Sequence, residues 1–481
     1  MNPASITSFD LLLAAPEIFL LTAACVILLA DLFIDDARRQ VTFVLSLIAL
    51  AGTAWVTART GVDARTVGWH GTYVADPVGS LLKVVAYGAV AVAFLYSYGY
   101  LQKRGILKGE FFVLGLFALL GIMVLISANS LVTLYLGVEL LALSLYAMVA
   151  FNRESGTAAE AAIKYFVLGS IASGCLLYGM SIVYGVTGTL ELGKVSEAVL
   201  ALGPNQIGLL FGLAFIIVGV SFKFGAVPFH MWVPDVYHGA PTAVTLFLSW
   251  APKLASFALA YRLLAEGLAG LADGWQDMLI VVSVLSMAIG NVVAIAQTNL
   301  KRMLAYSTIS HVGFILLGIL AGTSQGYESA LYYTIAYVIM SVGGFGMIIL
   351  LSRAGFEADS LEDFKGLNAR SPWFAAVMLM LMFSMAGVPP FIGFWAKLAV
   401  IQAVLGVSLL WLAVAAVVFS VIGAYYYLRV VKLMYFDEPV ERRALEGSGA
   451  LRFVLSVNGL AVLVLGMFPG LLLAVCAAVI P

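Results

Sequence analysis

The sequence predicts an all-α polytopic membrane protein with about fourteen transmembrane helices. Of its 481 residues, 63% are hydrophobic and only 11% are charged, whereas charged residues make up roughly 25% of a soluble domain. The mean hydropathy is +1.05, and the net charge of −1 provides no field that would attract a polyanion. This composition excludes a soluble enzyme, a nucleic-acid-binding protein and a disordered scaffold, and it makes the lipid bilayer the expected environment.

Apolar runs of about 20 residues, the length of a transmembrane helix, recur along the whole chain. None has the ten-residue alternation that is typical of a membrane β-barrel. The expected spans lie near residues 11–33, 41–59, 77–99, 110–127, 129–151, 158–186, 205–229, 239–264, 277–296, 302–321, 327–352, 373–399, 404–431 and 453–477.

Lysine and arginine are unevenly divided between the two sets of loops. The loops on the side of the amino terminus hold Arg59, Arg65, Lys194 and Arg262, whereas the opposite loops hold fifteen basic residues. Since cytoplasmic loops carry the excess of basic residues, both termini are expected on the non-cytoplasmic side. A missed helix would have scrambled this bias, so the bias also supports the number of spans.

Charged residues near the centres of expected spans need an explanation, because each costs about 2.5–3.5 kcal/mol on insertion scales. There are five, namely Glu139, Lys164, Lys223, Lys253 and Lys397. Lys83 differs from them, because it lies only six residues into its span and its side chain can extend to the bilayer surface. We therefore expect functional roles for the five and not for Lys83.

Glu139 and Lys164 lie on either side of the short loop 152–156. Their distances from this loop differ by about five residues, or 7–8 Å, which a lysine side chain largely spans. We therefore expect an ion pair between them across two antiparallel helices. The alternative is a pair that only locks the two helices together.

Lys223, Lys253 and Lys397 have no obvious acidic partner in the sequence. Together with Lys164, and against one Glu139, they would leave a formal charge of +3 if all were ionised. Desolvation and mutual repulsion both oppose that state. A buried lysine that releases its proton readily can carry protons, so we interpret these three as parts of a proton relay. The alternative is a purely structural role.

Prolines lie inside the expected spans close to these lysines. The four are Pro228, Pro252, Pro389 and Pro390, each within eight residues of Lys223, Lys253 or Lys397. A proline frees backbone carbonyls that lipid cannot satisfy. We therefore expect helix breaks at these positions, facing protein or a wet cavity.

Two of the breaks share a sequence pattern. Segments 225–229 and 387–391 both read Gly-x-x-Pro-Phe, and they interrupt the seventh and twelfth spans. If the fourth to eighth and the ninth to thirteenth spans form two five-helix units, the breaks have opposite orientation, as in inverted-repeat transporters. The expected division is a three-helix segment over 1–109, repeats over 110–265 and 266–436, and a last helix within 437–481.

Histidines are secondary candidates for the relay, because imidazole exchanges protons at physiological pH. His230 follows the first break and His311 lies in the tenth span, and a structural role is the alternative for both. The sequence has no CxxC pair, no Cys/His spacing typical of a metal site and no glycine-rich nucleotide loop. No cofactor or metal is therefore expected in this chain.

Four stretches of the sequence are distinctive, namely 137–140 (GVEL), 221–232 (SFKFGAVPFHMW), 235–242 (DVYHGAPT) and 386–391 (AGVPPF). They resemble the antiporter-like membrane subunits of proton-pumping NADH:quinone oxidoreductase (respiratory complex I), most of all the bacterial N subunits. The resemblance covers nearly the whole chain, and the second stretch is the most specific part of it. It implies interrupted seventh and twelfth helices, which the prolines predict independently.

The resemblance also implies roles for individual residues: Glu139 as the acid of the fifth helix, Lys164 as its partner, Lys223 as the central lysine, Lys253 as the connecting lysine and Lys397 as the terminal lysine. It implies a bacterial inner membrane protein with periplasmic termini and other membrane-arm subunits of complex I as partners. NADH, FMN, iron–sulfur clusters and quinone would then be bound by other subunits. The expected function is proton translocation coupled to quinone reduction in those subunits.

Two other functions remain open. A cation/proton antiporter subunit of the Mrp type has the same ancestry and would need no electron-transfer partners. A passive scaffold would use the buried lysines only for helix packing.

Overall fold

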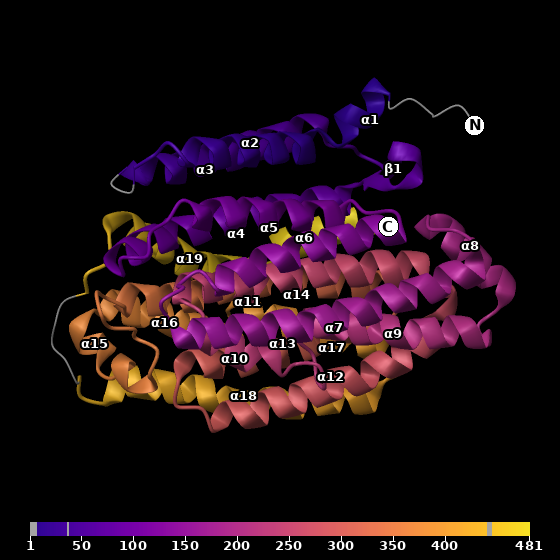
Figure 1. The fold of residues 1–481 in the computed structure, drawn as a ribbon. Helices are drawn as coiled ribbons and strands as arrows, with labels where there is room; N and C mark the ends of the chain where they lie inside the picture. The colour runs from indigo at the N-terminus through magenta and orange to yellow at the C-terminus, as the bar shows by residue number, and fades with distance from the viewer. Residues whose placement is uncertain (1–6, 36–37, 440–444) are drawn as a thin grey trace.

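The computed structural model describes residues 7–35, 38–439 and 445–481. Long helices run side by side and form one elongated bundle (Figure 1). The helices of the first half are α1 (Ser8–Leu13), α2 (Ala15–Asp31), α3 (Gln40–Thr60), α4 (Pro77–Lys103), α5 (Glu110–Ile126), α6 (Leu131–Val149), α7 (Gly156–Thr187), α8 (Leu192–Leu202), α9 (Ile207–Phe224), α10 (Trp232–Gly239), α11 (Thr242–Ala260) and the π-helical turn η3 (Tyr261–Gly267).

The second half is also helical. Its helices are α12 (Ala272–Ile295), α13 (Leu300–Leu320), α14 (Ser324–Leu351), α15 (Leu367–Arg370), α16 (Pro372–Ala386), α17 (Ile392–Gly406), α18 (Leu410–Phe436), α19 (Gly449–Met467) and α20 (Pro469–Val479). Short 3-10 turns cover Trp69–Gly71 (η2), Ala269–Leu271 (η4) and Leu361–Phe364 (η5).

The polytopic helical fold agrees with the prediction. Among the described residues, eleven helices are long and apolar enough to cross a membrane. All the expected spans coincide with helical segments. The twelfth span is divided into α16 and α17, whereas the seventh span ends with α9, and the short helix α10 follows the break, between the expected seventh and eighth spans.

A β-hairpin and the helix α8 lie outside the expected spans and were not predicted. Strands β1 (Thr66–Gly68) and β2 (Tyr73–Ala75) form an antiparallel hairpin in which Thr66 pairs with Ala75, and α8 is a short helix between α7 and α9. Strands of three residues give almost no periodic signal. Tertiary contacts fix the hairpin instead, because the Asp10 carboxylate accepts a 2.7 Å hydrogen bond from the Trp69 backbone amide.

The two ends of the bundle differ. Helix α1, the β-hairpin and α8 lie at one end, which we call the α1 end, and α15 lies at the opposite end, the α15 end (Figure 1). Pro481 lies at the α1 end, beside the start of α14, where the Ser324 hydroxyl donates to the Pro481 carbonyl at 2.8 Å.

The centre of the bundle is formed by α11, α13 and α14. Every residue of α11 is buried, and 94% of the most apolar window of α13 and of α14 is buried as well. A helix that is buried on all sides has no lipid-facing surface. Polar residues on these three helices therefore face protein, and two of the relay candidates, Lys253 of α11 and His311 of α13, lie there.

Candidate functional site

The two helix breaks are built alike. Helix α9 ends at Gly225 and α16 ends at Gly387, and these glycines have φ angles of 77° and 89°. Other residues rarely adopt this left-handed conformation, which explains glycine at the first position of the Gly-x-x-Pro-Phe pattern. The prolines at the fourth position, Pro228 and Pro390, both follow cis peptide bonds.

Polar groups from the protein satisfy the backbone freed at the breaks. The Lys397 amine donates to the carbonyl of Ala386, the last residue of α16, at 2.9 Å. In the first break, the Trp232 indole donates to the Phe222 carbonyl at 3.1 Å and the Ser286 hydroxyl accepts from the Val227 amide at 2.9 Å. The breaks therefore face protein, as predicted.

The predicted break at Pro252 is wrong, because α11 continues through this residue. A proline removes the hydrogen bond to the carbonyl four residues earlier, which here belongs to Leu248. The Tyr237 hydroxyl donates to that carbonyl at 3.1 Å. Since a neighbouring helix supplies the missing donor, the helix does not need to end.

Lys223 is near an acid that the sequence did not suggest for it. Its amine donates to the Ser173 hydroxyl at 2.9 Å and lies 3.8 Å from Oε1 of Glu139, to which Ser173 also donates. The side chains of Lys223 and Glu139 are 13% and 24% exposed, so this is a largely buried, hydroxyl-bridged pair.

The predicted ion pair between Glu139 and Lys164 is absent from this structure. The Lys164 amine instead lies 2.9 Å from Asp235 of α10 and 2.9 Å from Glu160, and its side chain is 44% exposed rather than buried. Residue counting gives depth along a helix but not the direction in which a side chain points. On α7 it is Ser173 that faces Glu139, nine residues beyond Lys164.

Lys253 and Lys397 are buried without an acid. The Lys253 amine donates to the Tyr237 hydroxyl at 2.8 Å and lies 5.2 Å from the centre of the Trp232 ring. The Lys397 amine donates to the Ser420 hydroxyl at 2.9 Å and lies 5.0 Å from the centre of the Phe314 ring. Among the described residues, no carboxylate forms an ion pair with either amine.

His311 of α13 contacts hydroxyl groups of α14 and α18. Its Nδ1 is 2.7 Å from the Tyr333 hydroxyl and its Nε2 is 3.1 Å from the Tyr427 hydroxyl, which also contacts Ser307 at 2.5 Å. Phe314, which contacts Lys397, is one helical turn along the same helix. His230 is partly buried, and its Nδ1 has no hydrogen-bond partner within the described part of the chain.

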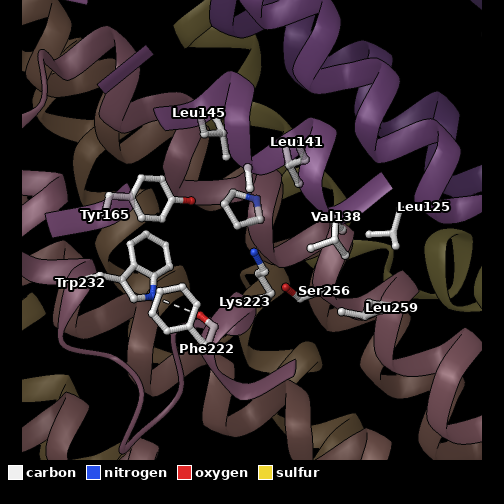
Figure 2. A pocket seen from close by; sticks show the side chains of 13 residues that line it. Leu125, Val138, Leu141, Leu145, Tyr165, Phe222, Lys223, Trp232, Ser256 and Leu259 are labelled. Carbon is white, nitrogen blue, oxygen red and sulfur yellow. Dashed lines mark hydrogen bonds between the residues drawn. The ribbon is translucent and has the colours of Figure 1, made fainter. Parts of the chain in front are cut away.

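A pocket lies beside the first break, and Figure 2 shows the Lys223 side chain directed into it. Aromatic side chains of Tyr165, Phe222 and Trp232 line one side, and leucines and Val138 line the other (Figure 2). Pro252 and Ser256 of α11 also line it, so this Lys223 pocket extends from α9 to the helix that carries Lys253.

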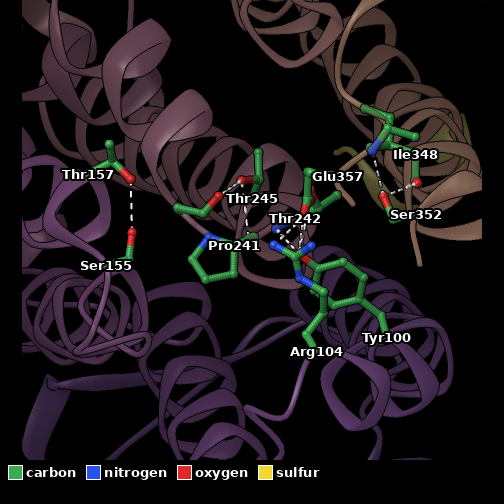
Figure 3. A network of polar contacts seen from close by, with 12 residues as sticks. Tyr100, Arg104, Ser155, Thr157, Pro241, Thr242, Thr245, Ile348, Ser352 and Glu357 are labelled. Atoms are coloured by element: carbon green, nitrogen blue, oxygen red, sulfur yellow. Dashed lines mark hydrogen bonds and ion pairs between the residues drawn. The ribbon is translucent and has the colours of Figure 1, made fainter. Parts of the chain in front are cut away.

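A carboxylate network fixes the start of α11 at the α15 end. Both oxygens of Glu357 accept from the Tyr100 hydroxyl, at 2.9 and 2.8 Å, and Arg104 lies 3.2 Å from one of them (Figure 3). The Thr242 amide donates to Tyr100 at 3.2 Å and its hydroxyl donates to Glu357. This network anchors the helix that carries Lys253 to α4.

The expectation that Lys83 extends to the bilayer surface is wrong. Its residue is only 5% exposed, and its amine lies 2.5 Å from Oε1 of Glu17 on α2. The Tyr73 hydroxyl donates to the other oxygen of Glu17 at 3.0 Å. An acid on the adjacent helix at the same depth removes the need to reach water, and the sequence does not reveal that adjacency.

Known proteins resemble this chain along its whole length. A sequence family described as "NADH:quinone oxidoreductase/Mrp antiporter, TM" matches residues 128–423. NADH-quinone oxidoreductase subunit N of Thioalkalivibrio sulfidiphilus is 59% identical over 472 residues, which cover 98% of each chain. The chain belongs to the subunit N family of NADH-quinone oxidoreductase.

Solved structures agree with this membership of the subunit N family. A chain of respiratory complex I from Thermus thermophilus is 30% identical, with a TM-score of 0.82 over 96% of this chain and 99% of that chain. A chain of the Mrp complex from a Dietzia species has a TM-score of 0.85 over 98% and 97% of the two chains. Its identity is 21%, so it shows a shared fold.

Three residues of this subunit N family member were not predicted as part of the site. Ser173 bridges Glu139 and Lys223, Tyr237 contacts Lys253, and Asp235 holds Lys164. Asp235 and Tyr237 lie in the distinctive stretch 235–242, which was a signal for them. No pattern in the sequence distinguishes Ser173 from other small residues of α7.

Proposed function

We propose that this chain carries one proton pathway across the membrane arm of a bacterial NADH:quinone oxidoreductase. It is a multi-pass protein of the bacterial inner membrane, as are its N-subunit relatives. Within the described residues, no group of three His, Cys, Asp or Glu side chains is placed to hold a metal ion. NADH, FMN, iron–sulfur clusters and quinone belong to other subunits, and the free energy of their reaction reaches this chain by coupling.

One observation carries the proposal: two buried lysines, Lys253 and Lys397, have hydroxyl and carbonyl partners but no carboxylate among the described residues. An ammonium group without a counter-ion is costly in hydrocarbon. Either amine is therefore a proton acceptor that holds its proton only transiently. Structural lysines in a core would more simply be replaced by apolar residues of similar volume.

The relay that we propose runs from the first helix break to the second. Glu139 and Ser173 hold Lys223 when it is charged, and the proton then passes through Lys253 toward Lys397. The His311 network is a candidate for the intervening steps, because His311 lies on α13 one turn from Phe314, which contacts Lys397. Moving each charge against the membrane potential costs about 2.3 kcal/mol per 100 mV, which the coupled reaction must supply.

Lys164 has a regulatory role in this scheme, because it can change the partner of Glu139. In the conformation described here, Asp235 and Glu160 bind it, and Glu139 binds Lys223. If Lys164 approached Glu139 in another conformation, it would compete with Lys223 and favour release of the Lys223 proton.

His230, with its unpaired Nδ1 near the break, is a candidate for proton delivery to Lys223.

The test of the proposal is Lys223→Ala in the assembled enzyme. We expect fewer protons translocated per NADH oxidised, measured in inverted membrane vesicles. Lys432→Ala is the matched control, because Lys432 is 63% exposed and pairs with Asp437 at the end of α18. Unchanged proton translocation in the Lys223 variant would remove this residue from the pathway.

The orientation and the repeats are further parts of the proposal. We propose periplasmic termini, because the α1 end carries few basic residues. We also propose inverted repeats over 110–265 and 266–436, between the segment 1–109 and the last helix within 437–481. Cysteines introduced at Lys194 and Lys103, at opposite ends, provide the test. Only Lys194→Cys should react with an impermeant maleimide added to right-side-out vesicles.

The second candidate is an Mrp-type antiporter subunit, which the shared fold with the Mrp complex favours. It predicts sodium-dependent proton flux from a complex that lacks NADH-oxidising subunits. The identity of 59% to an N subunit favours the first candidate.

A further inference from the structure

A second buried group of charges lies outside the proposed relay, between α2, α4 and the β-hairpin. Glu17 and Lys83 form an ion pair at 2.5 Å, and the Tyr73 hydroxyl contacts both side chains, at 3.0 and 3.1 Å. All three residues are less than 9% exposed. A buried ion pair is weak evidence for stability, because apolar residues of similar volume often serve as well.

A polar pocket adjoins this ion pair, and we call it the Lys83 pocket. Its lining includes Gly61, Tyr73, Asp76, Gly79, Lys83 and Ser127. Gly61 is exposed in the turn after α3, so the pocket lies next to solvent at the α1 end. The hydroxyl of Ser127 is buried and has no hydrogen-bond partner in the described chain. Polar walls and an unpaired hydroxyl are what a water-filled pocket requires.

Charged residues continue from this pocket to the surface. Asp76, which lines the pocket, lies 2.6 Å from Arg262. Arg262 lies 2.7 Å from Glu266, and Glu266 lies 2.9 Å from Arg65, whose side chain is 42% exposed. A series of charged residues therefore connects the Lys83 pocket with the surface at the α1 end.

The Lys83 pocket is close to the Lys223 pocket, and two helix segments separate them. At the end of α5, Leu125 lines the Lys223 pocket, whereas Ser127, two residues later, lines the Lys83 pocket. On α11, Leu259 lines the Lys223 pocket, and Arg262, one turn later, binds Asp76.

Ile126 completes the partition between the pockets. Its carbonyl accepts a 3.0 Å hydrogen bond from Arg262. Its side chain packs closely against Gly79, which lines the Lys83 pocket: a Cβ atom at position 79 would lie 3.2 Å from Cγ2 of Ile126. Leu125, Ile126 and Leu259 are all at most 1% exposed. They form a thin apolar layer, which we call the leucine barrier.

We propose that the Lys83 pocket is a water-filled vestibule open to the α1 side of the membrane, and that the leucine barrier insulates the Lys223 pocket from it. This inference rests on the proposed function, because a barrier is needed only beside a proton pathway. A proton that crossed directly from the vestibule to Lys223 would bypass the remaining steps of the relay and dissipate the membrane potential. Apolar side chains prevent this, because they offer water no hydrogen-bond partner.

The experiment measures passive proton leak in vesicles that contain the assembled enzyme, without NADH. Leu125→Ser and Leu259→Ser each place a hydroxyl in the barrier, and we expect a several-fold faster decay of an imposed pH gradient. The amount of assembled complex in the same membranes, measured on a native gel, establishes that each variant is assembled. If one variant fails to assemble, the other repeats the test on a different helix.

Two further variants make the test specific. Leu119→Ser is the matched control, because Leu119 is a fully buried α5 residue that lines neither pocket, and it should not increase the leak. Lys83→Met combined with Glu17→Leu removes the ion pair beside the vestibule and should reduce the leak of Leu125→Ser.

Three results would overturn the inference: no leak from either barrier variant, an equal leak from Leu119→Ser, or a leak that is insensitive to the Lys83 and Glu17 changes. The leak is measured without turnover, so a failure of this inference can be distinguished from a failure of the proposed function. The latter would appear as unchanged pumping by Lys223→Ala.

Discussion

The Tyr237 hydroxyl donates at 3.1 Å to the carbonyl of Leu248, whose helical hydrogen-bond donor is missing because Pro252 occupies that position. The same hydroxyl accepts from Lys253 at 2.8 Å. One tyrosine thus connects a proline and the lysine beside it, both on α11. It also explains how α11 remains continuous while holding a buried amine.

Tyr237→Phe removes the acceptor for Lys253 and the donor for Leu248. The unpaired carbonyl should cost about 1–3 kcal/mol of stability. If Lys253 carries protons, pumping should slow roughly tenfold, the effect of about 1.4 kcal/mol on a barrier. Proton uptake into inverted vesicles measures this. Tyr96→Phe is the control, because the buried Tyr96 hydroxyl has no partner among the described residues and its loss should be harmless.

Ser173→Ala breaks the bridge between Glu139 and Lys223 but keeps both charges. The direct separation of 3.8 Å is too long for a hydrogen bond, so Lys223 should be held less firmly. We expect slower pumping with unchanged assembly, and partial rescue by Ser173→Thr, which retains the hydroxyl. Equal pumping by the alanine variant and the unaltered enzyme would mean that the hydroxyl has no role in proton transfer.

Asp235→Asn leaves Lys164 with Glu160 alone and deprives Arg302 of its carboxylate partner at 2.9 Å. Since Lys164 and Asp235 are 44% and 37% exposed, stability should fall by no more than about 1 kcal/mol. Pumping should change more than stability, because Lys164 loses one of its two carboxylate partners and approaches Glu139 more readily. Glu160→Gln is the control that keeps Asp235, and it should pump normally; a similar defect in both variants would argue against a specific role for Asp235.

The contact between α1 and the β-hairpin should depend on acidity. Hydrogen bonds from Thr7 and from the Trp69 amide lower the pKa of Asp10 to about 2. A carboxyl group with a lowered pKa stabilises the folded state above its ordinary value near 3.8, and this stabilisation is lost as the pH falls toward 2. Pepsin cleavage within residues 61–75 should therefore increase as the pH falls below about 4. In Asp10→Asn this pH dependence should disappear, whereas cleavage elsewhere in the chain should follow the same course as before.

The helices and their breaks were largely predictable, because they depend on local properties. Runs of apolar residues mark segments that must satisfy their own backbone, and Gly225 and Gly387 with the prolines after them mark where they cannot. Pro252 was misjudged because its compensation comes from Tyr237, which lies on another helix. Lys83 was misjudged for the same reason, since its partner Glu17 lies 66 residues away in the sequence.

The sequence by itself determined that this chain lies in a membrane, that its helices break beside buried lysines, and that it resembles a proton-pumping family. These features follow from hydropathy, proline chemistry and motif identity, each of which is carried by neighbouring residues. Only the tertiary structure decided which charges meet: Glu139 with Lys223, Lys164 with Asp235 and Glu17 with Lys83. A helical position fixes the depth of a charge, but the rotation of each helix and its neighbours fix the partner, and these result from packing of the whole bundle.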